Sequence, residues 1–246
     1  VAAYSSMRLI FGPIWGGLSD RLGRKPVLMI GIFGYGIAMI FFGLSTKMWM
    51  LLLSRTLSGI LSSATSPTTM AYISDSTTEE ERGGGMGILG AAIGVGTILG
   101  PGLGGLLAGD SLSMPFFIAG GMSFLTLGLV AVFLPESLPP EARTSKSKPR
   151  VKLPIKAWQK ILSGPLGSLF FMAFLMTCGL MIFYGIFGLY ALEKYNFEPE
   201  QVGTVFMIFG LVSAVAQGLL CGPLSKRFGE AAVIKISLLG TAAGFS

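Results

Sequence analysis

Charged residues are scarce in this chain: they make up 12% of its 246 residues. Soluble domains usually carry about one quarter. Hydrophobic residues make up 52%, and the mean hydropathy is +0.72. A chain with so few charges cannot cover itself with water-compatible side chains, so the composition excludes an ordinary soluble domain and predicts a membrane protein.

Histidine is absent, which removes the commonest metal ligand and the usual general base near neutral pH. The two cysteines, Cys178 and Cys221, both lie in apolar runs, so we expect neither a disulfide framework nor a zinc site. No nucleophile–base set or cluster of metal ligands is evident in the sequence. We therefore expect no enzyme activity, no cofactor and no bound metal.

Long apolar stretches dominate the rest of the sequence. A helix needs about 20 mostly apolar residues to cross a bilayer. Apolar and polar residues do not alternate with a period of two, so the sequence does not indicate β-strands. An eighth stretch starts near Ala231. The seven stretches predicted to span as helices are Val1–Leu18, Pro26–Leu44, Trp49–Tyr72, Gly85–Ala108, Pro115–Leu134, Pro165–Leu192 and Val202–Leu224.

Lysine and arginine are concentrated in every second connection between the predicted spans. Fourteen lie in alternate connections and two, Lys47 and Lys194, lie in the others. In membrane proteins the connections rich in lysine and arginine face the cytoplasm. The distribution therefore predicts a multi-pass protein of the cell membrane and gives its orientation. The net charge of +6 therefore points to topology and not to nucleic-acid binding. The connections predicted to be cytoplasmic are 19–25, 73–84, 135–164 and 225–235.

The connection 135–164 is polar and basic, and it separates five spans from the rest. We expect an N-terminal bundle over 1–134, a cytoplasmic linker over 135–164 and the start of a second bundle over 165–246.

The run from Gly16 to Lys25 recurs in weaker form 206 residues later, from Gly222 to Glu230. Both copies follow a span on the same side, which predicts parallel repeats. The chain opens on Val1 and stops within an apolar run, so we expect it to be part of a longer protein.

Three motifs can be placed on the spans. The first, in the connection after the first stretch, comprises Gly16, Asp20, Arg21, Gly23, Arg24 and Lys25. The second comprises Leu51, Arg55, Gly59 and Ala64. The third comprises Gly96, Gly100, Pro101, Gly104 and Gly105.

With these motifs the chain resembles the major facilitator superfamily, and within it the drug:proton antiporters such as tetracycline, quinolone and multidrug pumps. The resemblance covers family span 2 to early span 9, and Pro135-Glu-Ser137 closes the sixth family span in many relatives. Two positions of the second motif depart from the family pattern, with Ser58 for glutamine and Leu61 for glycine. The resemblance implies an all-α fold of two helical bundles, here incomplete.

The resemblance also implies a role for each motif. Asp20 and Arg24 would form a gate that holds the bundles shut on the cytoplasmic side in one state; the alternative is that the basic turn is a topology signal alone. The third motif is associated with export by antiport; the alternative is helix packing, because small residues four apart let helices approach closely. The second copy of the turn has Lys226 where the acid is expected, which puts a latch there in doubt.

Two arginines lie within predicted spans. Arg55 comes six residues after Trp49, roughly 9 Å along its helix, and matches the family's proton-relay arginine. Arg8 lies twelve residues before Asp20 and has no support from a motif. Intramembrane arginines are costly and are functional candidates by default, although snorkelling is the alternative for both.

Aspartate and glutamate are absent from the predicted spans, although a proton antiporter needs a titratable group. The position at which some relatives carry a seventh-span glutamate is Tyr184 here. We expect the coupling carboxylate to lie in missing parts of the protein, or Arg55 and Arg8 to face an anionic substrate. Tyr184 and Gln217 are candidates to line a drug cavity; lipid-facing or packing roles are the alternative.

The sequence thus predicts a monomeric transporter that exports amphipathic small molecules in exchange for protons by alternating access. Its partners would be the substrate, protons and the lipid bilayer. An uptake symporter for a metabolite or organic anion is the first alternative. A non-transporting scaffold or receptor on the same fold is the second.

Overall fold

A computed structural model describes residues 2–109, 111–139, 143, 165–216 and 222–245. All regular elements in this part of the chain are helices. Their bounds are α1 Ala2–Leu22, α2 Arg24–Gly43, α3 Met48–Ser62, α4 Thr65–Ser76, α5 Arg82–Ala108, α6 Met114–Phe133, α8 Pro165–Tyr195, α9 Pro199–Val215, α10 Gly222–Phe228 and α11 Glu230–Phe245.

Four of these helices are long and apolar enough to cross a membrane: Arg24–Gly43, Arg82–Ala108, Met114–Phe133 and Gly167–Tyr195. They correspond to four of the seven predicted spans. The first predicted span is a helix, but its serines, Tyr4 and Arg8 lower its hydropathy. The last is represented by α9, which has 17 residues, and residues 217–221 lie outside the described part.

The predicted span Trp49–Tyr72 is not one continuous helix, and in this respect the prediction was wrong. The helix stops at Ser62 and resumes at Thr65. Pro67 has no N–H to donate to the carbonyl four residues earlier, which is that of Ser63, so the ladder breaks there. Instead the Ala64 N–H donates to the Leu61 carbonyl at 3.2 Å, and the Ser63 hydroxyl donates to the Ile60 carbonyl at 2.7 Å.

Two predicted connections are much tighter than expected. In the ranges 19–25 and 225–235, Gly23 and Gly229 are the positions outside a helix. Gly23 has φ of +105° and Gly229 has φ of +80°, a region in which a side chain is strained. The two glycines are 206 residues apart, so the repeat found in the sequence is also a repeat of backbone conformation.

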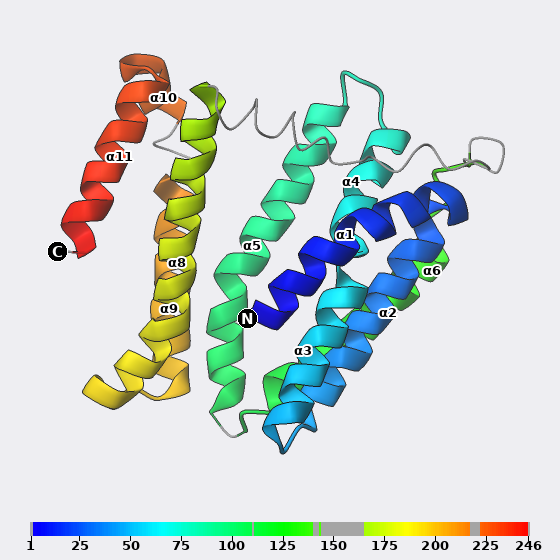
Figure 1. Cartoon of the computed structure of the whole chain (residues 1–246), viewed down its shortest axis with the longest axis horizontal. Coiled ribbons are helices and arrows are strands. Elements are labelled where there is room, and N and C mark those ends of the chain that lie inside the picture. Colours follow the sequence, from blue (N-terminus) through cyan, green and yellow to red (C-terminus); the bar gives the residue numbers. More distant parts are fainter. Residues whose placement is uncertain (1, 110, 140–142, 144–164, 217–221, 246) are drawn as a thin grey trace.

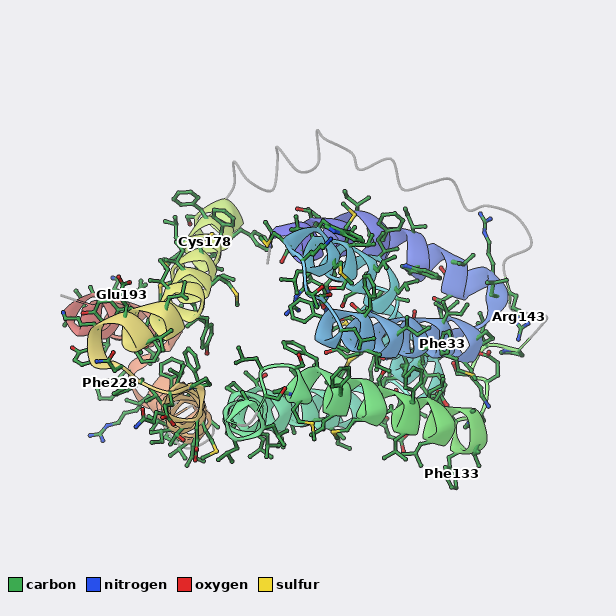
Figure 2. The ribbon with its side chains drawn as sticks, turned by 90° about the horizontal axis from the view of Figure 1, so that it is seen from below. Phe33, Phe133, Arg143, Cys178, Glu193 and Phe228 are labelled. Carbon is green, nitrogen blue, oxygen red and sulfur yellow. The ribbon has the colours of Figure 1, made fainter. Side chains whose placement is uncertain are left out.

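The helices form two groups with α5 between them (Figure 1). Helices α1 to α4 and α6 pack together, and α8 to α11 lie on the other side of α5. Viewed from one end, α9 lies beside α5 whereas α8 stands apart from α1–α4 (Figure 2). The predicted division into two bundles stays a prediction, and most of the predicted linker lies outside the described residues.

Buried positions are mostly small or hydroxylated, whereas large apolar side chains face outward. Ser19, Ser54, Ser58, Ser63 and Thr68 are among the most buried residues. Exposed leucine, isoleucine and phenylalanine side chains cover the outer faces of α5, α6 and α8. This distribution is typical of helices whose surroundings are lipid and whose contacts are made by small residues.

Side chains make local hydrogen bonds at the starts of α5 and α9. Thr78 and Glu81 bond reciprocally in the turn before α5, at 3.1–3.5 Å. At α9, Pro199 occupies the first turn, and Glu198 and Gln201 form a capping box.

Candidate functional site

Arg24 lies at the centre of a charged cluster where α1, α2 and α4 meet. Its Nη1 atom is 2.7 Å from Oδ1 of Asp20, and its Nε donates to Oδ2 of Asp75 at 2.9 Å. Nη1 also donates to the Ser19 hydroxyl at 2.6 Å. The Arg24 side chain is 9% exposed, so this guanidinium is held by two carboxylates almost out of contact with solvent.

A third acid, Glu136, caps the start of α2. Its carboxylate accepts the backbone N–H of Arg24 at 2.8 Å and that of Lys25 at 3.3 Å. These are two of the N–H groups that a helix start leaves unpaired. The Lys25 ammonium donates to the Ala131 carbonyl near the end of α6 at 2.8 Å. The segment after α6 is thereby tied to the turn between α1 and α2.

Gly23 is required in this turn for two reasons. Its φ lies in the left-handed region, and a β-carbon there would overlap the Glu136 carboxylate. Of the other predicted residues of this motif, Gly16 faces α4, where a β-carbon would lie 3.9 Å from Cβ of Pro67. Arg21 is exposed in the last turn of α1. The structure thus brings Asp20, Gly23, Arg24 and Lys25 into one site.

Sequence reasoning missed Asp75 and Glu136 as partners of Arg24. Asp75 lies in the last turn of α4, beside the negative end of the helix dipole. An acid in that position is unfavourable unless a cation compensates for it. Its presence at the end of this helix was therefore the sequence signal for a nearby cation. Glu136 is part of the Pro-Glu-Ser run already noted, and its target depends on the packing of α6 against α2.

Arg55 extends from α3 toward Phe42, close to the end of α2. Its guanidinium carbon is 4.3 Å from the centre of the Phe42 ring. This position is at the end of the bundle opposite the Arg24 cluster, because Phe42 is the next-to-last residue of α2 and Arg24 is the first. Arg8 is exposed on α1, and among the described residues it has no hydrogen bond or ion pair. The two arginines predicted to lie within spans are therefore in different environments.

The third motif lies on α5 where this helix packs closely on α9. A β-carbon on Gly105 would lie 2.7 Å from the Pro199 carbonyl oxygen and 2.9 Å from Cα of Gly203. On Gly203 it would lie 2.6 Å from the Pro101 carbonyl oxygen. Gly102, which sequence reasoning did not single out, faces Met207. These close approaches define the seam, by which we mean α5 residues 98–105 and α9 residues 199–210.

The remaining motif glycines do not contribute to this contact. A β-carbon on Gly96, Gly100 or Gly104 would meet no other atom within 4 Å among the described residues. The same is true of Gly90 and Gly94, nearer the start of α5. The seam therefore occupies the half of α5 away from the Arg24 cluster, and toward the start of α5 the two helices separate (Figure 1).

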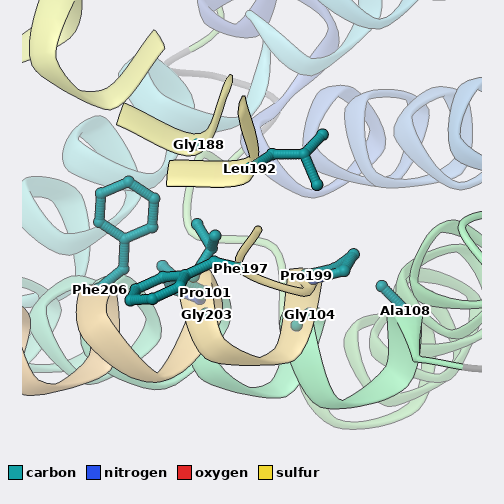
Figure 3. A pocket seen from close by; sticks show the side chains of 11 residues that line it. Pro101, Gly104, Ala108, Gly188, Leu192, Phe197, Pro199, Gly203 and Phe206 are labelled. Carbon is teal, nitrogen blue, oxygen red and sulfur yellow. The ribbon is translucent and has the colours of Figure 1, made fainter. Parts of the chain in front are cut away.

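An apolar pocket of about 370 Å³ lies beside the seam (Figure 3). Its walls come from α5, α8 and α9, and Phe206 and Phe197 supply its aromatic surface. Gly104 lines this pocket, which explains the open space beside it. The pocket is lined by Pro101, Gly104, Gly105, Ala108, Gly188, Leu192, Phe197, Pro199, Val202, Gly203 and Phe206.

Tyr184 belongs to an aromatic cluster between α8 and α9. Its ring centre is 5.3 Å from that of Phe206 and 6.2 Å from that of Phe209. Phe183 contacts the same two rings, at 6.3 Å and 6.1 Å. The predicted partner of Tyr184 in a drug cavity, Gln217, lies outside the described residues.

Comparison with known proteins agrees with this architecture. The family model described as Major Facilitator Superfamily matches residues 1–246. The chain belongs to the major facilitator superfamily. The resemblance read from the sequence motifs is therefore confirmed.

Several curated relatives match nearly the whole chain. Multidrug resistance protein 2 of Bacillus subtilis is 33% identical over 97% of this chain and 60% of its own length. The class G tetracycline resistance protein of Vibrio anguillarum is 31% identical over 100% and 62%. Quinolone resistance protein NorA of Staphylococcus aureus is 28% identical over 97% and 60%. The chain thus spans about 60% of the length of these relatives.

A solved structure is also similar. The human organic anion transporter MFSD10 (TETRAN) matches with a TM-score of 0.64 and 28% identity, over 96% of this chain and 59% of that one. Together with the apolar helices, this likeness identifies the chain as an incomplete major facilitator fold of a multi-pass membrane protein.

Proposed function

We propose that the protein containing this chain exports amphipathic small molecules, including antibiotics, in exchange for protons by alternating access. The observation that carries the proposal is the seam, in which residues of the antiporter-type motif bring α5 to within backbone contact of α9. Helix α5 lies between the two groups of helices and α9 belongs to the second, so the motif lies where the groups would move relative to each other. The relatives named for resistance to tetracycline, quinolones and multiple drugs support export.

The orientation proposed from the positive-inside rule places the Arg24 cluster on the cytoplasmic face of the cell membrane and the seam in the outer half. In this arrangement the seam closes the outer side, and the cluster is available to latch the cytoplasmic side in the alternate state. Asp20 and Arg24 would form that gate, and Arg55 would relay protons. Tyr184, Arg8 and Gln217 would line the substrate route, and the transporter would act as a monomer.

The test is drug accumulation in bacteria that lack their own pumps. The natural full-length chain that contains these residues is expressed, and ethidium accumulation is measured with and without a protonophore. We expect low accumulation that rises when the proton gradient is dissipated. Accumulation equal to that of the empty vector, for ethidium, tetracycline and a fluoroquinolone alike, would refute export. Unchanged transport by the Arg55→Ala variant would refute the relay role.

An uptake symporter for organic anions is the second candidate. It is favoured by the two intramembrane arginines and by the likeness to a structure named as an organic anion transporter. Right-side-out and inverted membrane vesicles distinguish the two directions. Fluorescein uptake into right-side-out vesicles, driven by a proton gradient and accompanied by no ethidium uptake into inverted vesicles, would favour this alternative.

A further inference from the structure

The Arg55 guanidinium lies in an aromatic setting. Side chains on a helix tilt toward its N-terminus, and α3 begins at Met48, so Arg55 reaches back toward the start of its own helix. There its guanidinium carbon lies 4.3 Å from the Phe42 ring centre. A separation of less than about 6 Å from the ring centre is a cation–π contact.

The Phe42 ring also packs against a second aromatic ring, that of Phe116. Its centre is 4.4 Å from that of Phe116, with 49° between the ring planes. Phe116 is the third residue of α6, so the stack joins α3, α2 and α6. A β-carbon on the adjacent Gly43 would lie 2.9 Å from the Phe117 ring, which keeps α2 and α6 close at this level. The ring beneath the guanidinium therefore has little freedom to move away.

We propose that Phe42 is a positioning residue for Arg55: its ring face holds the guanidinium at a fixed place toward the outer end of the bundle. The physical reason is that a cation within a span is costly unless a partner attracts it, and a ring face attracts a cation without adding a counter-charge. A guanidinium held in this way keeps its charge unneutralised for other groups. This inference rests on the proposed relay role of Arg55.

The test replaces Phe42 with phenylalanines that carry one, two or three ring fluorines, by nonsense suppression in the full-length protein. Fluorine withdraws charge from the ring face and leaves the shape of the side chain nearly unchanged. We expect ethidium export to fall stepwise with each fluorine, and by up to about 30-fold when the ring is replaced by leucine, the factor that corresponds to a desolvated cation–π contact.

Phe33 offers a matched control. It lies on α2 and pairs with Phe124 of α6, with ring centres 5.9 Å apart and 69° between planes, so it joins the same two helices. The described residues place no cation over this pair. Fluorination at Phe33 should therefore leave export unchanged. An equal decline at both positions would show that Phe42 acts through packing alone, and would overturn the inference.

A measurement without transport separates this inference from the relay proposal. The ¹⁹F resonance of 4-fluorophenylalanine at position 42 should shift when Arg55 is replaced by glutamine, and the same probe at position 33 should not. If Arg55→Ala abolishes export but neither fluorination nor the resonance at position 42 responds, the positioning role fails and the relay survives. If the resonance responds and Arg55→Ala exports normally, the contact exists but the relay proposal fails.

Discussion

Replacing Gly105 by alanine should open the seam between α5 and α9. The added methyl carbon would lie 2.7 Å from the Pro199 carbonyl oxygen and 2.9 Å from Cα of Gly203. Ordinary contact needs about 3.5–4.0 Å, so the backbones must separate by about 1 Å. Both obstacles are backbone atoms, which cannot turn aside as a flexible side chain can. We expect a cost of about 1–3 kcal/mol to the closed seam, the usual range for an overpacked contact.

The adjacent residue provides the control. Gly104→Ala adds the same methyl group one position away, where it meets no described atom within 4 Å and extends into the pocket. Helix propensity and composition change equally in the two variants. The difference between their labelling rates therefore isolates the effect of contact with α9. Gly203→Ala is a second probe from the opposite wall, because its methyl carbon would lie 2.8 Å from Cα of Gly105.

The assay is the rate at which a membrane-impermeant maleimide labels a cysteine placed at Ala108, which lines the pocket at the end of α5. The native cysteines are first replaced by serine. A cost of 1–3 kcal/mol corresponds to an increase in the open population of roughly 5- to 150-fold, as long as the closed form dominates. We expect faster labelling for Gly105→Ala and Gly203→Ala and no change for Gly104→Ala.

Coupling between the two seam variants sharpens this test. Once one methyl group has separated the helices, the second should cost less, so the double variant should be less perturbed than the sum of the singles. Equal labelling of Gly104→Ala and Gly105→Ala would refute the reasoning, because it would mean that the close approach of α5 to α9 does not limit access. Strict additivity would refute the claim that both glycines serve one contact.

Five further variants address the Arg24 cluster. Asp75→Asn should lower the free energy of unfolding by about 1–3 kcal/mol, because it removes one of two carboxylates from a guanidinium that is 9% exposed; Asp20→Asn should cost less, since Asp20 is 52% exposed. Both are measured by the thermal unfolding of the purified protein, and the reverse order would contradict the geometry. Glu136→Ala should cost about 1 kcal/mol through loss of a helix cap, and Glu136→Gln less, because an amide oxygen can still accept one N–H. Arg24→Lys should behave like a loss of one ion pair, since an ammonium cannot reproduce the two separate donors, Nε and Nη1, and full retention of the melting temperature would contradict this.

Much of the fold could be predicted because it depends on local properties. Apolar length predicts α2, α5, α6 and α8, and charge alternation is consistent with their connections. The break at Ser63 carried a signal in Pro67, but tolerance of proline within membrane helices made that signal ambiguous, as the continuous α5 around Pro101 shows.

The site was only partly predictable, because its partners are distant in sequence. Arg24 could be singled out by its motif, but its pairing with Asp75 depends on the position of α4 beside α2. Gly105 could be singled out as a small residue for packing, whereas its partner Gly203 could not be, since many glycines in these spans have the same spacing. For Arg55, snorkelling and function were the alternatives, and the direction of its side chain depends on the position of Phe42.

The two copies of the repeated turn differ in the order of their charged residues. Each has a glycine with positive φ between helices, but the order of charges is reversed: Asp20 precedes Arg24, whereas Lys226 precedes Glu230. Arg24 therefore starts a helix, at the positive end of its dipole, which is unfavourable for a cation.

Glu230 starts α11 at the equivalent position, where the helix dipole favours an acid. At the first turn, Asp20 at the end of α1 and Asp75 from α4 hold the Arg24 guanidinium, and Glu136 caps the helix start. A turn that depends on contacts from α4 and from the end of α6 responds to the movement of either. This conflict between a cation and the helix dipole, more than the motif letters, is the physical reason to propose the gate at Arg24 and not at its repeat.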